Sequence, residues 1–158
     1  MSTPNSGAKI RKNIIFAQVF IMGRILAIDY GQKRAGLAVT DPLKITANAL
    51  DTVPVHEIFD FLRKYMTNEQ VEKIIVGLPK QMSGELSSSM QYIEPFVRGL
   101  KNNFPNIPIE YVDERFTSSM AQKVILEAGA KRKDRQNKAL VDKVAATIIL
   151  QTYLESNR

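Results

Sequence analysis

The sequence contains no cysteine and only one histidine among its 158 residues. The absence of cysteine excludes disulfide bonds and thiolate metal sites, and it is most easily reconciled with a reducing cytoplasm. The one histidine, His56, stands at the start of an expected helix without an obvious nucleophile partner, so we expect it at the surface. The serines at 87–89 stand in no G-x-S-x-G setting, and neither a Walker loop nor a G-x-G-x-x-G loop is present. These absences disfavour serine hydrolases, P-loop enzymes and dinucleotide-binding enzymes.

No hydrophobic run is long enough to span a bilayer, so we expect no membrane partner. Residues 14–22 follow a basic patch and imitate a secretory signal, but the run is short, is interrupted by Gln18 and lacks a small-x-small cleavage site. Met22 and Gly23 directly precede the first expected strand. We therefore expect residues 1–21 to be an N-terminal extension, either disordered or the product of a mis-set start codon, and residues 22–158 to form one domain.

The net charge of +6 is a weak indicator of a polyanionic partner. Three basic residues and no acidic residue lie within the first 22 positions, which leaves a net charge of +3 for the remainder. With 44% apolar and 24% charged residues, the composition is that of an ordinary globular domain. Local clusters of charge must therefore indicate the partner.

Residues 24–39, with the sequence RILAIDYGQKRAGLAV, form the stretch around which the chain is organised. A continuous apolar run predicts a strand buried on both faces, and Asp29 closes it. Gly31 allows a tight turn, and Gly36 lies inside a second apolar run, where glycine indicates a bulge or a close backbone approach. Taken alone, Asp29 is either a ligand for a metal or phosphate-metal complex or the cap of the following turn.

The rest of the chain predicts alternating strands and helices. The expected elements are a strand at 45–53, a helix from Pro54 to about 66, a strand at 71–78, a helix from Glu85 to about 103, a strand at 107–112, a helix to about 128 and a last helix at 134–154. Pro95 must kink or divide the second of these helices, because it lacks an amide donor. The order β-β-β-α-β-α-β-α-α predicts an α/β fold with a mixed five-stranded sheet flanked by helices.

Acidic residues stand at the ends of two expected strands and on the last helix. They are Asp29, the adjacent pair Asp113 and Glu114, and Asp142. Clustered carboxylates without histidine or cysteine are hard ligands suited to Mg²⁺ or Mn²⁺, and two such ions can activate water and stabilise a leaving oxygen in phosphodiester chemistry. The pattern leaves open whether Asp113 or Glu114 is the ligand and whether one or two metals bind.

Asp142 is expected on an otherwise apolar face of the last helix. Ala139, Ala146 and Ile149 share that face at three- and four-residue spacing, and these small side chains allow the helix to lie close to the sheet. A partly buried acid needs a partner. The alternative to a metal ion is an ion pair with Lys138, four residues earlier, or with the neighbours of Lys143.

Basic residues gather near the proposed acidic site. Phosphate binding is the functional interpretation of this cluster, and a solvated basic face is the alternative. Arg115 directly follows the acidic pair and can contact a phosphate through two hydrogen bonds, or form a salt bridge with Asp113 or Glu114. The other candidates for nucleic-acid binding are Lys33, Arg34, Lys131, Arg132, Lys133, Arg135 and Lys138.

Four stretches together resemble the successive motifs of the YqgF family, also called the RuvX or pre-16S rRNA nuclease family. They are DYGQKRAGLAVTD at 29–41, IIVGLPKQMSG at 74–84, VDERFTS at 112–118 and NKALVDKVAATIIL at 137–150. The resemblance covers nearly all of 22–154. It implies an RNase H-like fold related to Holliday junction resolvases, a cytoplasmic location, and phosphodiester hydrolysis in maturing the 5′ end of small-subunit ribosomal RNA.

The resemblance also implies roles for individual residues. Asp29, Glu114 with Asp113 beside it, and Asp142 match the family's acidic positions, and Arg115 and Lys138 match its basic ones. Ser83 departs from the family, whose members commonly carry an acid before the loop glycine; Pro95 is a second departure. The implied protein is a Mg²⁺- or Mn²⁺-dependent endonuclease with metal ligands Asp29, Glu114 and Asp142.

Competing functions share most of these residues. The expected partner is precursor ribosomal RNA or another structured nucleic acid, and the small ribosomal subunit is a further expected partner. A Holliday junction resolvase-like DNA endonuclease would use the same metal site, and a noncatalytic RNA-binding assembly factor would keep the acids as ion pairs. A sugar-kinase or actin-like ATPase needs two lobes, for which the chain is too short.

Overall fold

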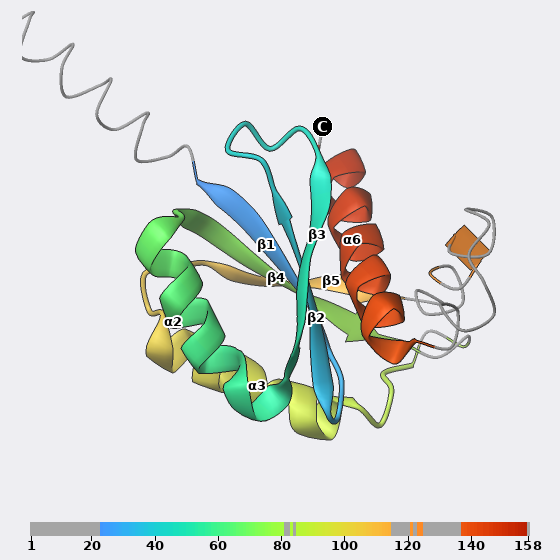
Figure 1. Ribbon diagram of the computed structural model, residues 1–158. Helices are drawn as coiled ribbons and strands as arrows, with labels where there is room; N and C mark the ends of the chain where they lie inside the picture. The colour runs from blue at the N-terminus through green and yellow to red at the C-terminus, as the bar shows by residue number, and fades with distance from the viewer. Residues whose placement is uncertain are drawn as a thin grey trace, which may run out of the picture.

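Figure 1 shows the computed structural model, which describes residues 23–80, 83, 85–114, 121, 123–124 and 137–157. The expected extension at 1–21 lies outside this range. The elements are β1 (Arg24–Tyr30), β2 (Arg34–Thr40), β3 (Ala47–Pro54), the 3₁₀ helix η1 (Val55–Glu57), α2 (Ile58–Asn68), β4 (Val71–Pro79), α3 (Met90–Asn103), β5 (Ile109–Glu114) and α6 (Lys138–Ser156).

The described strands form the predicted mixed five-stranded sheet, in the order β3-β2-β1-β4-β5. The meander β1-β2-β3 is antiparallel, and β1, β4 and β5 run parallel to one another. Parallel strands end at the same edge of a sheet, where α/β proteins collect their ligands. Asp29 near the end of β1 and Glu114 at the end of β5 therefore come to the same edge.

Two apolar layers hold the helices on opposite faces of the sheet. Helices α2 and α3 cover one face and α6 covers the other (Figure 1). Strand β1 serves both layers, because Leu26 and Ile28 pack into the α2/α3 side while Ile25 and Ala27 pack against α6. This alternation explains why its sequence is a continuous apolar run. Each fully buried leucine or isoleucine contributes about 1.5–3 kcal/mol.

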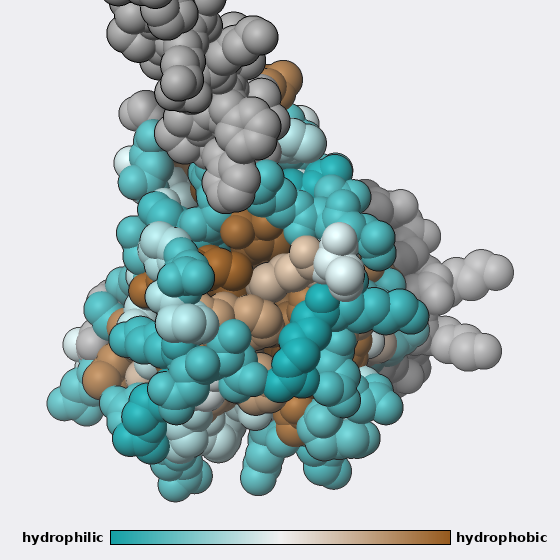
Figure 2. Space-filling view, turned by 90° about the vertical axis from the view of Figure 1, so that its left-hand side faces the viewer, coloured by the Kyte–Doolittle hydropathy of each residue, from teal (hydrophilic) through white to brown (hydrophobic). Residues whose placement is uncertain are grey.

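The outer surface is largely hydrophilic on the side that lies at the left in Figure 1. Figure 2 views that side and shows hydrophobic residues gathered in a hollow near its centre, with hydrophilic residues around them. Within the described part of the chain, no helix has the length and apolar character needed to cross a membrane.

Several predicted boundaries differ from the structure. Pro95 was expected to kink or divide its helix, and the division is wrong, because α3 continues through it. Pro95 is exposed, so the carbonyl left without an amide partner lies on the water side. Helix α3 begins at Met90 rather than Glu85. Strand β5 extends to Glu114, since Glu114 pairs with Pro79 at the end of β4. The helix expected near 117–128 and the expected helix start at 134 fall largely or wholly outside the described residues.

Candidate active site

Strand alternation directs two of the predicted acids toward α6. Ile25 and Ala27 of β1 pack against α6, and Asp29 follows them at the same two-residue period. Val112 of β5 packs against the same cluster, and Glu114 follows it two residues later. The structure therefore places both carboxylates on the α6 face of the sheet.

Gly77 makes room for Glu114 between the sheet and α6. A Cβ atom at this position of β4 would overlap the Glu114 carboxylate and lie 2.9 Å from Cδ1 of Ile149. The carboxylate of Glu114 thus lies over the backbone of the neighbouring strand, beneath the helix. The sequence interpretation missed this role for Gly77, although a glycine inside an apolar strand was a usable signal.

Gly36 lets α6 approach the sheet at Asp142. A Cβ atom on Gly36 would overlap the backbone carbonyl of Asp142 and lie 3.0 Å from its Cβ. The sequence indicated either a bulge or a close approach at Gly36, and the close approach is confirmed. The backbone of Asp142 therefore lies directly above β2, on the same face of the sheet as Asp29.

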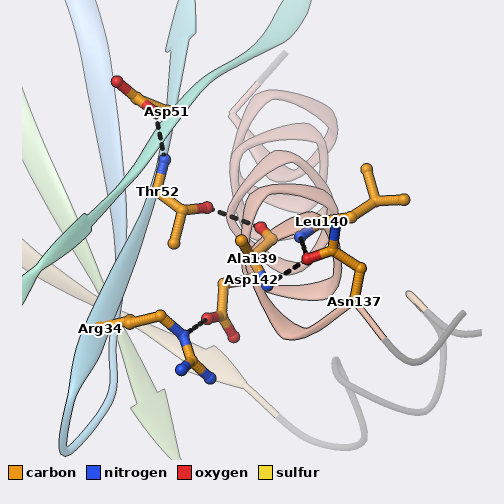
Figure 3. Close-up of polar contacts among 7 residues, drawn as sticks. All are labelled: Arg34, Asp51, Thr52, Asn137, Ala139, Leu140 and Asp142. Carbon is orange, nitrogen blue, oxygen red and sulfur yellow. Dashed lines mark hydrogen bonds and ion pairs between the residues drawn. The ribbon is translucent and has the colours of Figure 1, made fainter. Parts of the chain in front are cut away.

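The first turn of α6 is held by three hydrogen bonds that involve the side chains of Thr52 and Asn137 (Figure 3). Thr52 of β3 donates from its hydroxyl to the carbonyl of Ala139 at 2.6 Å. The Asn137 side chain caps the helix by accepting from the amides of Ala139 and Leu140 at 3.1 and 3.4 Å. An N-cap of this kind contributes about 0.5–2 kcal/mol. Together these contacts fix the turn that carries Asp142, and neither residue was identified from the sequence.

Asp29 is buried and feels the negative charge of the other two predicted acids, Glu114 and Asp142. Burial raises the pKa of Asp29 well above its ordinary value, the negative charges of Glu114 and Asp142 raise it further, and so does a side-chain hydrogen bond with Glu114. Burial also raises the pKa of Asp142, while the hydrogen bond and charge of Arg34 and the charge of Lys138 oppose that rise. Ionisation of Asp29 is therefore strongly disfavoured without a nearby cation.

Asp113 lies apart from this group. It precedes Glu114 in β5, so its side chain points to the opposite face of the sheet. It is exposed, and its carboxylate accepts from Nζ of Lys80 at 3.5 Å. The structure thus brings Glu114, and not Asp113, to Asp29. The catalytic role of either residue remains a prediction.

Arg34, rather than Lys138, forms the ion pair with Asp142. Nε of Arg34 lies 3.2 Å from Oδ2 of Asp142, and Figure 3 shows the guanidinium reaching from β2 to the helix. Beside this pair is a cavity of about 320 Å³ lined by Gly31, Gln32, Lys33, Arg34, Lys138 and Asp142. The other predicted phosphate-binding residues, Arg115, Lys131, Arg132, Lys133 and Arg135, lie outside the described residues.

The donor chemistry of the site fits Mg²⁺ or Mn²⁺. Asp29 and Glu114 are hydrogen-bonded carboxylates, and carboxylate oxygens are the ligands that these ions prefer. Among the residues that the structure describes, no group of three or more acidic or histidine side chains is arranged so that it could hold a metal ion as it stands. The carboxylate of Asp142 is paired with Arg34, whose charge offsets part of its own.

The sequence matches one family model over residues 23–156, and that family is described as RuvX, Holliday junction resolvase. The chain belongs to the RuvX family. Its relatives include proteins of Bacteroides thetaiotaomicron and Flavobacterium psychrophilum, each named "Putative pre-16S rRNA nuclease". The first is 64% identical over 137 residues, which cover 87% of this chain and 99% of the relative. The second is 57% identical over 133 residues, covering 84% and 97%.

The fold comparison agrees with RuvX membership. A crystal structure of Fowlpox virus resolvase with its substrate Holliday junction DNA matches 85% of this chain and 98% of that chain, with 15% identity and a TM-score of 0.52. At that identity the match concerns the fold alone. It confirms the expectation of an RNase H-like fold.

The raised pKa of Asp29 makes the pH dependence of stability in this RuvX protein testable. Native Asp29 holds its proton to a higher pH than it does in the unfolded chain, where its pKa is about 3.9. Its contribution to the free energy of unfolding is therefore greatest below that unfolded pKa and is lost as the pH rises through the native pKa. Without metal, Asp29→Asn should be more stable than wild type at neutral pH, and urea titrations across pH should show a flatter profile.

Asp41 provides the control of opposite sign. Its carboxylate accepts from the amides of Ile45 and Thr46, both at 2.8 Å, and backbone hydrogen bonding to Thr46 lowers its pKa. Asp41 therefore contributes stability above its unfolded pKa and loses it as the pH falls through the native value. Asp41→Ala should be less stable than wild type at neutral pH. A destabilised Asp29→Asn would contradict the proposed repulsion among the carboxylates.

Proposed function

We propose that this RuvX-family protein is a divalent-metal-dependent endonuclease that matures the 5′ end of small-subunit ribosomal RNA. The single observation that carries the proposal is the position of Asp29, whose pKa is raised by burial and by the neighbouring Glu114 and Asp142. Buried repulsive carboxylates are costly, and they are characteristic of functional sites. The names of relatives 57–64% identical over nearly their whole length support the choice of substrate.

In the proposed mechanism, Asp29 and Glu114 would hold Mg²⁺ or Mn²⁺, and Asp142 would complete the set. When bound, such an ion supplies Lewis acidity for activating water and stabilising the leaving oxygen. A carboxylate must be deprotonated to bind a metal ion. Because the pKa of Asp29 is raised, its carboxyl would have to lose a proton when the ion binds. Metal binding is therefore expected to weaken as the pH is lowered.

Basic side chains would position the substrate strand. Lys33, Arg34 and Lys138 line the cavity next to Asp142 and can bind phosphate groups. We extend this role to Arg115, Lys131, Arg132, Lys133 and Arg135 on the strength of their charge and their place in the sequence. We further propose that the protein acts in the cytoplasm on precursor rRNA, free or in the small ribosomal subunit.

The second candidate is a DNA endonuclease acting on four-way junctions. The description of the matching family model, Holliday junction resolvase, is the observation that favours it. Its catalytic apparatus would be the same, because both backbones present the same phosphodiester to the carboxylates. Only the substrate distinguishes the two candidates.

The test is cleavage of a 5′-extended 16S rRNA transcript in the presence of Mn²⁺, with EDTA in a parallel reaction and a four-way DNA junction as competitor. We expect a 5′-end cut that requires Mn²⁺ and is little inhibited by the junction. Cleavage of the junction in preference to the transcript would favour the second candidate. Undiminished cleavage in EDTA would exclude the metal-dependent mechanism.

A further inference from the structure

The ion pair between Arg34 and Asp142 occupies one of the three proposed metal ligands. Nε of Arg34 lies 3.2 Å from Oδ2 of Asp142. Their side chains are 37% and 26% exposed, so the pair is neither sealed in the core nor free in solvent. A charge-assisted contact of this kind directs the carboxylate oxygen toward the guanidinium. The guanidinium occupies one of the two carboxylate oxygens and offsets the negative charge of Asp142, so it weakens the attraction of Asp142 for a cation at Asp29.

The cavity beside the pair offers Arg34 a different anion. Its lining carries three cationic side chains, Lys33, Arg34 and Lys138, and a single acid, Asp142. A volume of about 320 Å³ admits a phosphate group of a nucleic-acid strand. Guanidinium groups bind phosphate through two parallel hydrogen bonds, so a phosphate in this cavity competes directly with Asp142 for Arg34.

The geometry points to Arg34 as a substrate-operated gate: it pairs with Asp142 and offsets the charge of this carboxylate until a substrate phosphate enters the neighbouring cavity and takes the guanidinium. Asp142, released, then completes the site with Asp29 and Glu114. This inference rests on the proposed metal-dependent function. Arg34 is a positioning residue in this scheme, because it acts through Asp142.

The gate requires reciprocal coupling between metal and phosphate. If phosphate releases Asp142 for the metal, then metal binding must favour phosphate binding by the same factor. Coupling between two sites in proteins commonly amounts to about five- to hundredfold in affinity. Before the substrate arrives, the protein binds metal weakly and would be protected from unproductive metal-loaded states.

The experiment measures Mn²⁺ affinity by electron paramagnetic resonance in wild type, Arg34→Gln and Lys138→Gln. Each titration is done with and without uridine 5′-monophosphate, which carries a phosphate but no phosphodiester to cleave, and is referenced to nucleotide without protein. Arg34→Gln should bind Mn²⁺ about five- to hundredfold more tightly than wild type without nucleotide. The nucleotide should tighten Mn²⁺ binding to wild type and have little effect on Arg34→Gln.

Lys138→Gln is the matched control, because it removes the same charge from the same cavity. Lys138 influences Asp142 through its charge, whereas Arg34 also hydrogen-bonds to it. Lys138→Gln should therefore gain clearly less Mn²⁺ affinity than Arg34→Gln. Equal affinities of Arg34→Gln and wild type, or equal gains in the two variants, would overturn the gate alone.

Two further outcomes keep the gate and the proposed function separable. If Arg34→Gln fails to fold, the test rests on the wild-type protein. An Mn²⁺ affinity of wild type that is the same with and without the nucleotide would overturn the gate. If no variant binds Mn²⁺ under any condition, the metal-dependent function fails and the gate fails with it. Cleavage assays are not needed for either conclusion.

Discussion

Replacing Asp29 with asparagine should reduce Mn²⁺-dependent cleavage of the rRNA precursor by about a hundredfold or more. Asp29 is a buried carboxylate whose pKa is raised by burial and by the negative charges of Glu114 and Asp142. Asparagine keeps the shape but removes the charge on which the cation depends. The measurement is the initial rate of transcript cleavage at saturating Mn²⁺, with the native fold verified by circular dichroism.

Asp60→Asn is the control for this loss. Asp60 is an exposed acid on α2, paired with Arg63 at 2.8 Å and situated on the opposite face of the sheet from α6. Its replacement should leave the cleavage rate within about twofold of wild type, since exposed ion pairs contribute little. Equal rates for Asp29→Asn and wild type would remove Asp29 from the catalytic site.

The second large effect is expected at Gly36, where α6 touches the sheet. Alanine at this position would place its methyl group onto the backbone carbonyl of Asp142, which cannot rotate aside as a flexible side chain could. Overpacking of this kind costs about 1–3 kcal/mol. Because the helix must shift to relieve it, Asp142 moves as well, so cleavage should fall together with the free energy of unfolding. Urea denaturation and the cleavage assay measure the two effects.

Gly99→Ala separates this contact from a general intolerance of alanine. Gly99 lies in α3 on the other face, and a methyl group there would approach the end of the Phe59 ring, at 2.8 Å from Cζ. A side chain can give way more easily than backbone, and alanine also favours the helix. Gly99→Ala should retain wild-type cleavage. A fully active and stable Gly36→Ala would show that the close approach at Asp142 is unimportant.

Strand β1 and the position of Asp29 at its end could be predicted, because both depend on residues that are adjacent in the sequence. The apolar run of β1 serves two cores, and Asp29 closes it at an edge that parallel strands share. The choice between Asp113 and Glu114 could not be made in the same way. It depends on where β5 ends, and pairing of Glu114 with Pro79 sets that limit through a contact distant in sequence.

The partner of Asp142 could not be predicted for the same reason. Periodicity along α6 favoured Lys138, four residues earlier, but the ion pair is made by Arg34, which is 108 positions away in the chain. The packing of β2 against α6 at Gly36 brings the two residues together. Gly36 was recognisable as a site of close approach, but the sequence did not indicate which element approaches it.

The most direct test of the three-carboxylate site compares Glu114→Gln with Asp113→Asn in Mn²⁺-dependent cleavage of the precursor transcript. The two acids are adjacent in sequence, but only Glu114 lies on the face shared with Asp29. We expect a loss of about a hundredfold or more for Glu114→Gln and near wild-type cleavage for Asp113→Asn. Wild-type cleavage by Glu114→Gln, or loss in Asp113→Asn alone, would contradict it.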